Sequence, residues 1–328
     1  MPLIRPLFAR LTAVLLLVAC AAFPMSTVAQ AYPDKAVRII VPHGAGSSPD
    51  ATTRLVAQHL TERLGQSFVV ENRAGAGGVI GMGAIAKAAP DGYTLGIGHI
   101  GTLTINPSVY AKLPYDPVKD FVPIMQSVET PLLMVASESS PYKTVADVVA
   151  AAKANPGKLT FSSAGNGTAS HMAGEYFATQ AGISLTHVPF KGAVDALTAV
   201  AAGSVAITFG GQPAAWPLVK ADKLRALGLT AASRVAEFPE TPVVAETLKG
   251  YAVLDWNGFI APAGTPQPII DKLQREISAV LAQSDVIRQL RGQGVIPVPN
   301  TSAEFAAFIA SERQKWSRVA KEVNIRLD

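Results

Sequence analysis

Residues 37–50 read VRIIVPHGAGSSPD and hold the local pattern that decides the fold. The β-branched run Val37–Val41 predicts a buried strand, and the two glycines behind it permit a sharp turn. Ser48 suits a helix N-cap and Pro49 the first helical position, so we expect a helix that runs to Leu64. Unpaired N–H groups at a helix start carry partial positive charge, so this loop predicts a site for an anion.

The alternation of short β-branched runs with alanine-rich stretches continues along the chain. Further strands are expected at Phe68–Glu71, Thr94–Ile97, Leu132–Ala136, Leu159–Ser162, Ser184–Val188 and Val205–Phe209. Further helices are expected at Val79–Lys87, Val145–Ala154, Ser170–Ala181 and Val194–Ala202. Three consecutive amphipathic helices form the tail, at Ile269–Leu281, Asp285–Arg291 and Ser302–Val323. The pattern predicts an α/β protein with mainly parallel sheets.

Residues 1–31 are predicted to be an export signal. Two arginines precede an apolar run, Leu11–Ala22, that is too short to span a bilayer. Two processing sites compete. We favour cleavage after the small-residue site at 29–31, whereas a lipobox-like LVAC ending at Cys20 would leave that cysteine lipid-anchored. A periplasmic location is expected in either case.

Composition excludes several functional classes. The chain has 49% hydrophobic and 16% charged residues, which is typical of a folded globule rather than a disordered tail. Its formal net charge of +4 falls to +2 without the two arginines of the export signal, and basic residues are spread singly, so nucleic acid is not an expected partner. Cys20 is the only cysteine, so the mature chain has neither a disulfide nor a thiolate metal site.

A second loop, TFSSAGNGTASH at residues 160–171, repeats the design of the first. It passes from a strand through glycines to a hydroxyl residue and a helix start. Turns at residues 188–193 and 209–213 end strands in the same way. One such turn is common in any α/β protein, but several turns rich in Gly, Ser and Thr at strand carboxyl ends favour a shared oxyanion site.

Neither a cofactor nor a metal ion is predicted. The glycine-rich segments lack the third glycine of a dinucleotide fingerprint and the lysine of a P-loop. The five histidines, at 43, 59, 99, 171 and 187, include no i, i+4 histidine pair and no Cys/His spacing. His43 and His99 each follow an apolar strand, so each can be a cleft residue or a structural one. No G-x-S-x-G elbow occurs, and Ser163 with His171 is not by itself a nucleophile–base pair, so the protein is not expected to be an enzyme.

The helical tail indicates two lobes. The chain is expected to leave a first sheet near Ser127, build a second, return near Asp255 and pack its tail on the first. Two such crossings make a hinge, with a ligand cleft where strand ends face each other. Trp256 is expected at the cleft, and Trp316 in the core. The predicted lobes are residues 32–128 with 253–328, and residues 129–252.

Short motifs in order along nearly the whole mature chain resemble the Bug-type (TctC-like) receptors of tripartite tricarboxylate transporters. They are YPDKAVR at 32–38, VENRAGAGG at 70–78, PDGYTL at 90–95, LPYD at 113–116, KDF at 119–121, NPGKL at 155–159, HVPFKG at 187–192, KLRAL at 223–227 and PAGTP at 262–266. The resemblance implies a two-lobed, Venus-flytrap solute-binding protein. It also implies capture of a small organic anion and delivery to the membrane permease subunits of such a transporter. We expect a monomer.

The resemblance places the family's ligand loops at residues 43–50 and 101–107 in the first lobe, with strand-end turns opposite. The predicted ligand-binding residues are His43, Gly46, Ser47, Ser48, Asp50, Gly101, Thr102, Ser163, Gly167, Thr168, His171, Gly210 and Gly211. One carboxylate is expected to bind N–H groups and hydroxyls of Ser47, Ser48 and Thr102. The far end of the ligand is expected to contact Ser163 and Thr168.

The chain departs from the family pattern in the first loop and at Gly210. Many members carry phenylalanine, proline and paired glycines where this chain has His43, Ala45, Gly46 and Ser47. Gly210 stands where amino-acid-binding members resemble one another in having an aspartate. A buried ammonium needs an acceptor. We therefore predict a mono- or dicarboxylate, aromatic acids included, rather than an amino acid. The alternative of a different class is a hydrolase or transferase that acts on a small anionic ester through the same loops.

Overall fold

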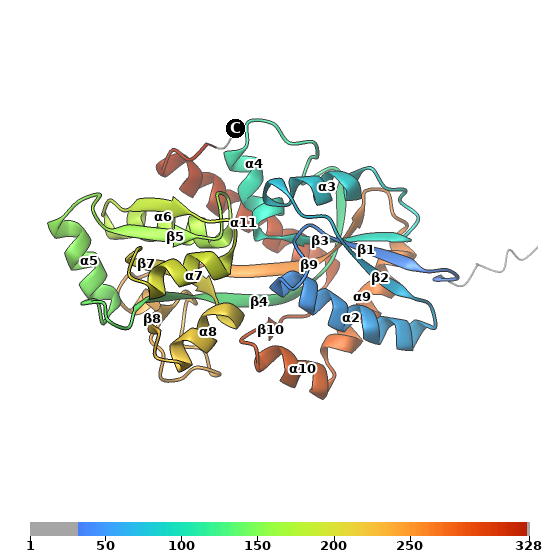
Figure 1. Cartoon of the computed structure of the whole chain (residues 1–328). Coiled ribbons are helices and arrows are strands. Elements are labelled where there is room, and N and C mark those ends of the chain that lie inside the picture. Colours follow the sequence, from blue (N-terminus) through green and yellow to red (C-terminus); the bar gives the residue numbers. More distant parts are fainter. Residues whose placement is uncertain (1–31, 327–328) are drawn as a thin grey trace, which may run out of the picture. The chain divides into compact units, whose positions relative to one another are not determined.

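A computed structural model describes residues 32–326 (Figure 1). Residues 1–31, which include the predicted export signal and Cys20, lie outside the described residues, as do 327 and 328. From Lys35 onward the chain forms one compact unit, and the fold below is that of this unit. None of the described helices combines the length and apolar character needed to cross a bilayer.

One group of elements is built on parallel strands whose carboxyl ends share an edge. Its strands are β1 (Val37–Val41), β2 (Phe68–Asn72), β3 (Thr94–His99), β9 (Leu254–Pro262) and the short β10 (Ile296–Pro297). Its helices are α2 (Ser48–Leu64), α3 (Val79–Ala86), α4 (Asn106–Val109), α9 (Gln267–Leu281), α10 (Ser284–Arg291) and α11 (Ser302–Glu322), with the short helical segments η1 (Ala76–Gly78) and η2 (Gly101–Ile105). Strand β1 lies between β2 and β3, parallel to both, and β3 pairs antiparallel with β9.

A second group repeats the arrangement. Its strands are β5 (Thr160–Ser163), β6 (Thr186–Pro189), β7 (Ile207–Gly211) and β8 (Leu224–Leu229). Its helices are α5 (Val145–Ala154), α6 (Ala169–Ala181), α7 (Ala193–Ala201) and α8 (Gln212–Lys220), followed by the short segment η3 (Val244–Glu246). Strand β5 is parallel to its neighbours β6 and β7.

The long strand β4 (Phe121–Ser137) joins the two groups, and the strand order is β2-β1-β3-β9-β4-β7-β5-β6. Up to Pro131 it pairs with β9, and from Leu132 it pairs with β7 and β8. Thr230 links the two crossings, because its Oγ1 accepts the Leu132 N–H at 2.7 Å and donates to the Val253 carbonyl at 2.5 Å.

The predicted α/β class is confirmed, but the expectation of mainly parallel sheets is wrong. Strands β4, β8, β9 and β10 pair antiparallel, because β4 and β9 cross between the groups in opposite directions. The sequence patterns missed β8, β9 and α8. Helix α8 contains Pro217, which interrupts the helical signal. The three predicted tail helices correspond to α9, α10 and α11.

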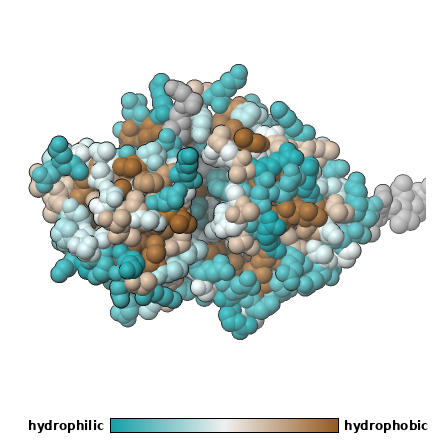
Figure 2. All heavy atoms as spheres, viewed as in Figure 1, coloured by the Kyte–Doolittle hydropathy of each residue, from teal (hydrophilic) through white to brown (hydrophobic). Residues whose placement is uncertain are grey.

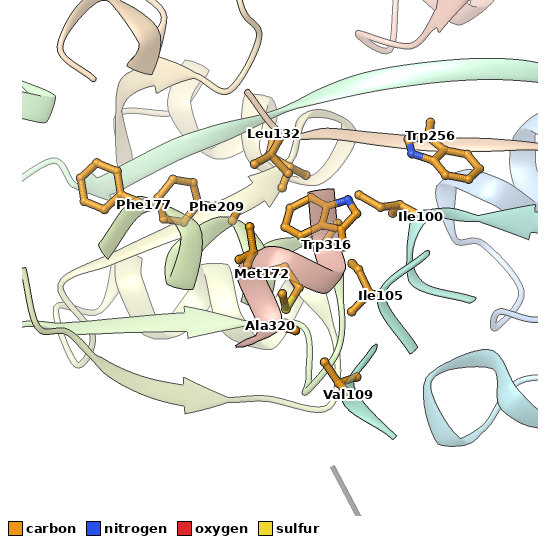
Figure 3. Packing of buried hydrophobic residues seen from close by; sticks show 14 of the residues in the cluster. Ile100, Ile105, Val109, Leu132, Met172, Phe177, Phe209, Trp256, Trp316 and Ala320 are labelled. Atoms are coloured by element: carbon orange, nitrogen blue, oxygen red, sulfur yellow. The ribbon is translucent and has the colours of Figure 1, made fainter. Parts of the chain in front are cut away.

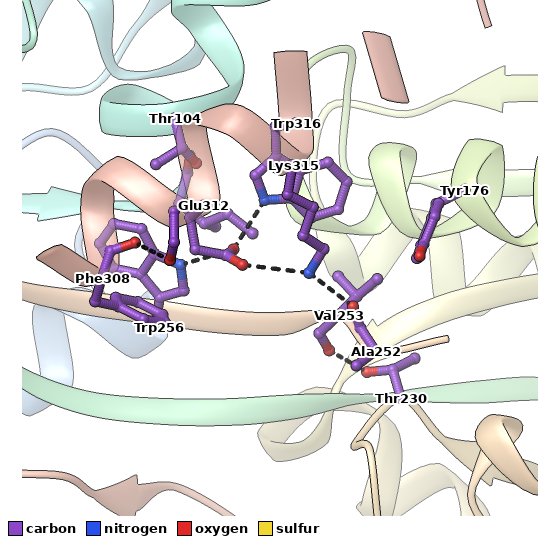
Figure 4. Close-up of polar contacts among 12 residues, drawn as sticks. Thr104, Tyr176, Thr230, Ala252, Val253, Trp256, Phe308, Glu312, Lys315 and Trp316 are labelled. Atoms are coloured by element: carbon purple, nitrogen blue, oxygen red, sulfur yellow. Dashed lines mark hydrogen bonds and ion pairs between the residues drawn. The ribbon is translucent and has the colours of Figure 1, made fainter. Parts of the chain in front are cut away.

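The tail helix α11 carries large side chains into the core. Trp316 and Trp256 are both fully buried, and Figure 3 shows them in one cluster with side chains from both groups of elements. Glu312 joins the two indoles: its Oε2 accepts the Nε1–H of Trp316 at 2.9 Å and that of Trp256 at 3.4 Å (Figure 4). Lys315 donates to the Ala252 carbonyl at 2.8 Å, beside the return crossing. The predicted cleft position of Trp256 is therefore wrong, and Trp316 is a core residue as expected.

Candidate functional site

A pair of histidines lies at the carboxyl ends of β1 and β3. His43 follows β1 and His99 ends β3, and because these strands are parallel neighbours their ends meet at one edge. The ring centroids are 4.2 Å apart, with the planes tilted by 54°. Burial lowers the pKa of His43 to about 4, and burial together with the neighbouring His43 lowers the pKa of His99 well below its usual value. Both rings are therefore neutral at pH 7.

The loops after β1 and β3 contain buried polar side-chain atoms that have no hydrogen-bond partner. Nδ1 of His99 accepts the Gly101 N–H at 3.0 Å, so the proton of the neutral ring lies on Nε2. Nε2 of His99, Nε2 of His43 and Oγ of Ser47 are buried without a hydrogen-bond partner, and they are three of the six such side-chain atoms found within residues 32–326. An unpaired buried polar group costs about 1–3 kcal/mol. Their gathering at the loops after β1 and β3 indicates a site for a group that accepts hydrogen bonds.

The start of α2 explains the free hydroxyl of Ser47. The helix begins at Ser48, one residue earlier than expected, so that Ser47 rather than Ser48 is the N-cap. The Ser47 side chain makes no capping hydrogen bond. Pro49 lies in the first turn, where its missing N–H removes no intrahelical bond. The first turn therefore keeps unpaired N–H groups beside an unpaired hydroxyl, as an anion site requires.

Asp50 holds this loop in shape rather than facing a ligand. Its buried carboxylate accepts the Gly46 N–H at 2.8 Å, an Asn72 amide N–H at 2.8 Å and the Arg54 Nε–H at 3.1 Å. Burial raises the pKa of Asp50, but the hydrogen bonds from Arg54, Gly46 and Asn72 outweigh it and hold the pKa below its usual value. The expected direct ligand contact of Asp50 is therefore not supported, because its oxygens are already occupied.

Thr102 also differs from expectation. Its hydroxyl accepts the His99 N–H at 3.2 Å and donates to the His99 carbonyl at 3.3 Å, and the residue is fully buried. The hydroxyl closes the turn into η2 and cannot also bind a carboxylate in this arrangement. Its neighbour Gly101 lies where the two groups of elements touch, since a Cβ built on Gly101 would come 3.6 Å from the Gly167 carbonyl oxygen. Figure 2 shows a hollow between these groups.

The loop after β5 brings together the predicted residues of the second group. Thr168 caps α6, accepting the His171 N–H at 3.4 Å and donating to the Gly165 carbonyl at 2.7 Å. Nδ1 of His171 accepts the Gly167 N–H at 3.2 Å. Ser163 is fully buried, and its Oγ lies 2.6 Å from Nε2 of His187 and donates to the Gly165 carbonyl at 3.1 Å. These side chains satisfy one another, unlike those of the first loop.

His187 was missing from the predicted site. It stacks on His171 with centroids 3.9 Å apart and on Phe161 at 4.8 Å. Burial, with a smaller effect of His171, lowers the pKa of His187 to about 3. A register argument could have found it, because His187 lies opposite Phe161 in the parallel β5–β6 pair. His99 was also missing, although its place after an apolar strand was noted.

Gly210 does not face the hollow. A Cβ built there would come 2.9 Å from Leu197 Cδ2 and 3.4 Å from Ala215 Cβ, whereas a Cβ on Gly211 would meet nothing within 4 Å. Successive residues of a strand point to opposite faces, so a side chain at 210 would enter the core and one at 211 would enter open space. The prediction that the missing side chain at Gly210 selects the ligand is therefore wrong, and position 211 is the one with room.

The comparisons with known proteins agree with one another. The family model described as "Tripartite tricarboxylate transporter family receptor" (TctC) matches residues 52–325. Protein BugT of Bordetella pertussis is 34% identical over 321 residues, which cover 97% of this chain and 98% of BugT. The structure of R. palustris Rpa4515 with adipate has a TM-score of 0.84 at 34% identity and covers 90% of this chain and 99% of that one. MatC of Rhodopseudomonas palustris with bound malate has a TM-score of 0.79 at 32% identity, covering 88% and 99%. The chain belongs to the TctC family of tripartite tricarboxylate transporter receptors, which are two-lobed periplasmic solute-binding proteins.

Proposed function

We propose that this protein captures a small organic carboxylate outside the cytoplasm and presents it to the permease subunits of a tripartite tricarboxylate transporter. The observation that carries the proposal is the set of unpartnered donors on His43, Ser47 and His99. A carboxylate only accepts hydrogen bonds, so it suits a lining in which the His99 ring and the Ser47 hydroxyl can donate. Adipate and malate, the ligands in the structures of two relatives, are both dicarboxylates and support this class.

One carboxylate lies against the first loop in this proposal. The Nε2–H of His99 and the hydroxyl of Ser47 donate to it, and His43 donates when its proton is on Nε2. Gly78 packs closely against this loop, because a Cβ on it would come 2.6 Å from Thr102 Cγ2 and 3.3 Å from Nε2 of His99. Because the two rings stay neutral, the only charge in this contact is that of the carboxylate. Hydrogen bonds to a charged acceptor are about twice as strong as those between two neutral groups.

The two lobes are residues 32–128 with 253–328 and residues 129–252. Strand β4 changes partners after Pro131 and β9 begins at Leu254, next to both proposed boundaries. Rotation about these crossings separates Gly101 from Gly167 and admits the ligand. A ligand that bridges both lobes favours the closed state by its differential affinity.

The far end of the ligand meets the loop after β5. Thr168 is half-buried whereas Ser163 has no exposed surface, so Thr168 is the better candidate of the two predicted hydroxyls once the ligand replaces the Gly165 carbonyl as the acceptor of its proton. The open space at Gly211 lies on the same carboxyl edge of the second sheet. The size of the group accepted there sets the choice among aliphatic and aromatic acids.

The absence of catalysis is part of the proposal. Ser163 and His187 have the spacing of a nucleophile and its base, 2.6 Å. Ser163 is nevertheless fully buried, so an ester carbonyl cannot reach its Oγ without a large displacement of the loop. The relatives described above are binding receptors, which favours capture over hydrolysis.

A thermal-shift panel on the purified mature protein tests the proposal. Adipate, malate, citrate, terephthalate, nicotinate, aspartate and glutamate are compared, with adipamide as the uncharged control of adipate. A ligand at 100 times its Kd stabilises the fold by about 2.7 kcal/mol, and adipamide is expected to give no shift. A p-nitrophenyl ester assay accompanies the panel. Ester turnover with no shift for any carboxylate would overturn the proposal.

A further inference from the structure

Helix α6 and the edge strand β6 bring two imidazoles and a carboxylate together. His171 and Glu175 are four residues apart on one face of α6, and Nε2 of His171 lies 3.5 Å from Oε1 of Glu175. His187 comes from β6 and stacks on His171 with an angle of 19° between the rings. One ligand atom of each residue lies within 4.8 Å of the other two, and no other such group of three is found in the described part of the chain.

We propose that His171, Glu175 and His187 form a binding site for a divalent transition-metal ion such as Zn²⁺. Two imidazoles and one carboxylate, with a fourth position left for water, are a known zinc ligand set. Ligands about 2.1 Å from a tetrahedral ion are about 3.4 Å apart. The 3.5 Å between His171 and Glu175 matches this spacing. His187 must turn out of its stack with His171 to become the third ligand, because imidazole lone pairs lie in the ring planes and those of two stacked rings do not converge on one ion.

The hydrogen bonds of His187 prepare it to act as a ligand. When Ser163 Oγ gives its proton to the Gly165 carbonyl, it accepts the Nε2–H of His187. The proton of the neutral ring is thereby on Nε2, and Nδ1 keeps a free lone pair. A hydrogen bond from the second ring nitrogen to a neighbour is the usual way in which proteins orient a metal-binding histidine.

His171 connects the metal site to the loop after β5. Its Nδ1 accepts the Gly167 N–H, so the ring proton is on Nε2 in the metal-free protein. When Nε2 binds the metal, the proton moves to Nδ1 and the Gly167 N–H loses its acceptor. Metal binding therefore changes the segment that touches Gly101 of the other lobe. The site itself does not depend on the proposed carboxylate function.

Calorimetric titration of the untagged, EDTA-treated mature protein with ZnCl₂ tests the site. We expect one equivalent of Zn²⁺ to bind, and E175Q to bind at least tenfold more weakly. The matched control is E62Q, because Glu62 pairs with His59 on α2 at 4.0 Å but belongs to no group of three ligands. Wild-type affinity in E175Q, or no stoichiometric binding by the wild-type protein, would overturn the proposal.

Two measurements on the wild-type chain keep the proposal testable if E175Q does not fold. Substoichiometric Co²⁺ is expected to broaden the imidazole NMR signals of His171 and His187 before those of His59. Zn²⁺ is expected to speed hydrogen exchange at the Gly167 amide. Broadening of the His43 and His99 signals first, with His171 and His187 unchanged, would place the metal elsewhere and refute the assignment.

Discussion

The two histidine pairs have the same residue types and opposite hydrogen bonding. His43 and His99 are tilted against each other, and Nε2 of each is buried without a partner. His171 and His187 are stacked, and their ring nitrogens meet Gly167, Glu175 and Ser163. The role of a buried histidine is thus decided by the groups around it. The first pair retains unused ring nitrogens for a ligand, whereas three of the four ring nitrogens of the second pair have partners within the protein.

The largest expected effect concerns acid stability, which both pairs lower together. The pKa of His43 is about 4 and that of His187 about 3 in the folded chain, against about 6.5 when unfolded. Between pH 6.5 and 4 the unfolded state binds more protons, so stability is present above pH 6.5 and is lost as the pH falls. We expect a loss on the order of 3 kcal/mol in urea unfolding between pH 7 and 4.5.

The double variant H43F/H187F is expected to flatten this pH dependence. The buried Asp255 acts in the opposite direction, because burial raises its pKa to about 6 and its protonation favours the folded state as the pH falls. A stability profile of H43F/H187F as steep as that of the wild-type protein would show that His43 and His187 do not cause the acid sensitivity.

Single phenylalanine variants separate the two pairs. H187F is expected to destabilise the protein by about 2 kcal/mol. The phenylalanine ring cannot replace the 2.6 Å hydrogen bond between His187 and the buried hydroxyl of Ser163. The midpoint and slope of urea unfolding at pH 7.5 measure this loss. An unchanged midpoint would mean that the second pair is not held by its hydrogen bonds.

H43F is expected to stabilise the ligand-free protein, whereas H187F destabilises it. It removes a buried nitrogen that has no partner, so the ligand-free protein gains about 1 kcal/mol. The same change removes a donor and weakens carboxylate binding. Unfolding with and without a saturating carboxylate measures both effects. A loss of stability in the ligand-free protein would contradict the view that His43 waits for an external acceptor.

The smallest effect on stability is expected at Ser47. S47A leaves the free energy of unfolding within about 0.5 kcal/mol, because the hydroxyl makes no hydrogen bond in the ligand-free structure. T102V is the contrast, since the Thr102 hydroxyl makes two bonds with His99, and it is expected to cost about 1–2 kcal/mol. Equal losses of unfolding free energy in S47A and T102V would show that the Ser47 hydroxyl is hydrogen-bonded as firmly as the Thr102 hydroxyl.

Local sequence patterns predicted most helices and strands but not the directions of side chains. Strand β1 agrees in full with the β-branched run, and α5 with the helix expected at Val145–Ala154. The side on which Gly210 faces depends on the phase of β7 in the sheet, and the meeting of His187 with Ser163 depends on the β5–β6 register. Neither can be read from one strand alone. The ligand loops stay a prediction, and within them the structure does not support direct roles for Asp50 and Thr102.

The NMR signals of the imidazole nitrogens show whether His99 donates to the bound carboxylate. Long-range ¹H–¹⁵N spectra at pH 7.5 are recorded as adipate or malate is added, with His187 as the internal comparison. The account predicts that the Nε2–H of His99 becomes protected and shifts on binding, while the ring of His187 keeps its hydrogen bond to Ser163. Binding of the ligand with an unchanged His99 signal would contradict it.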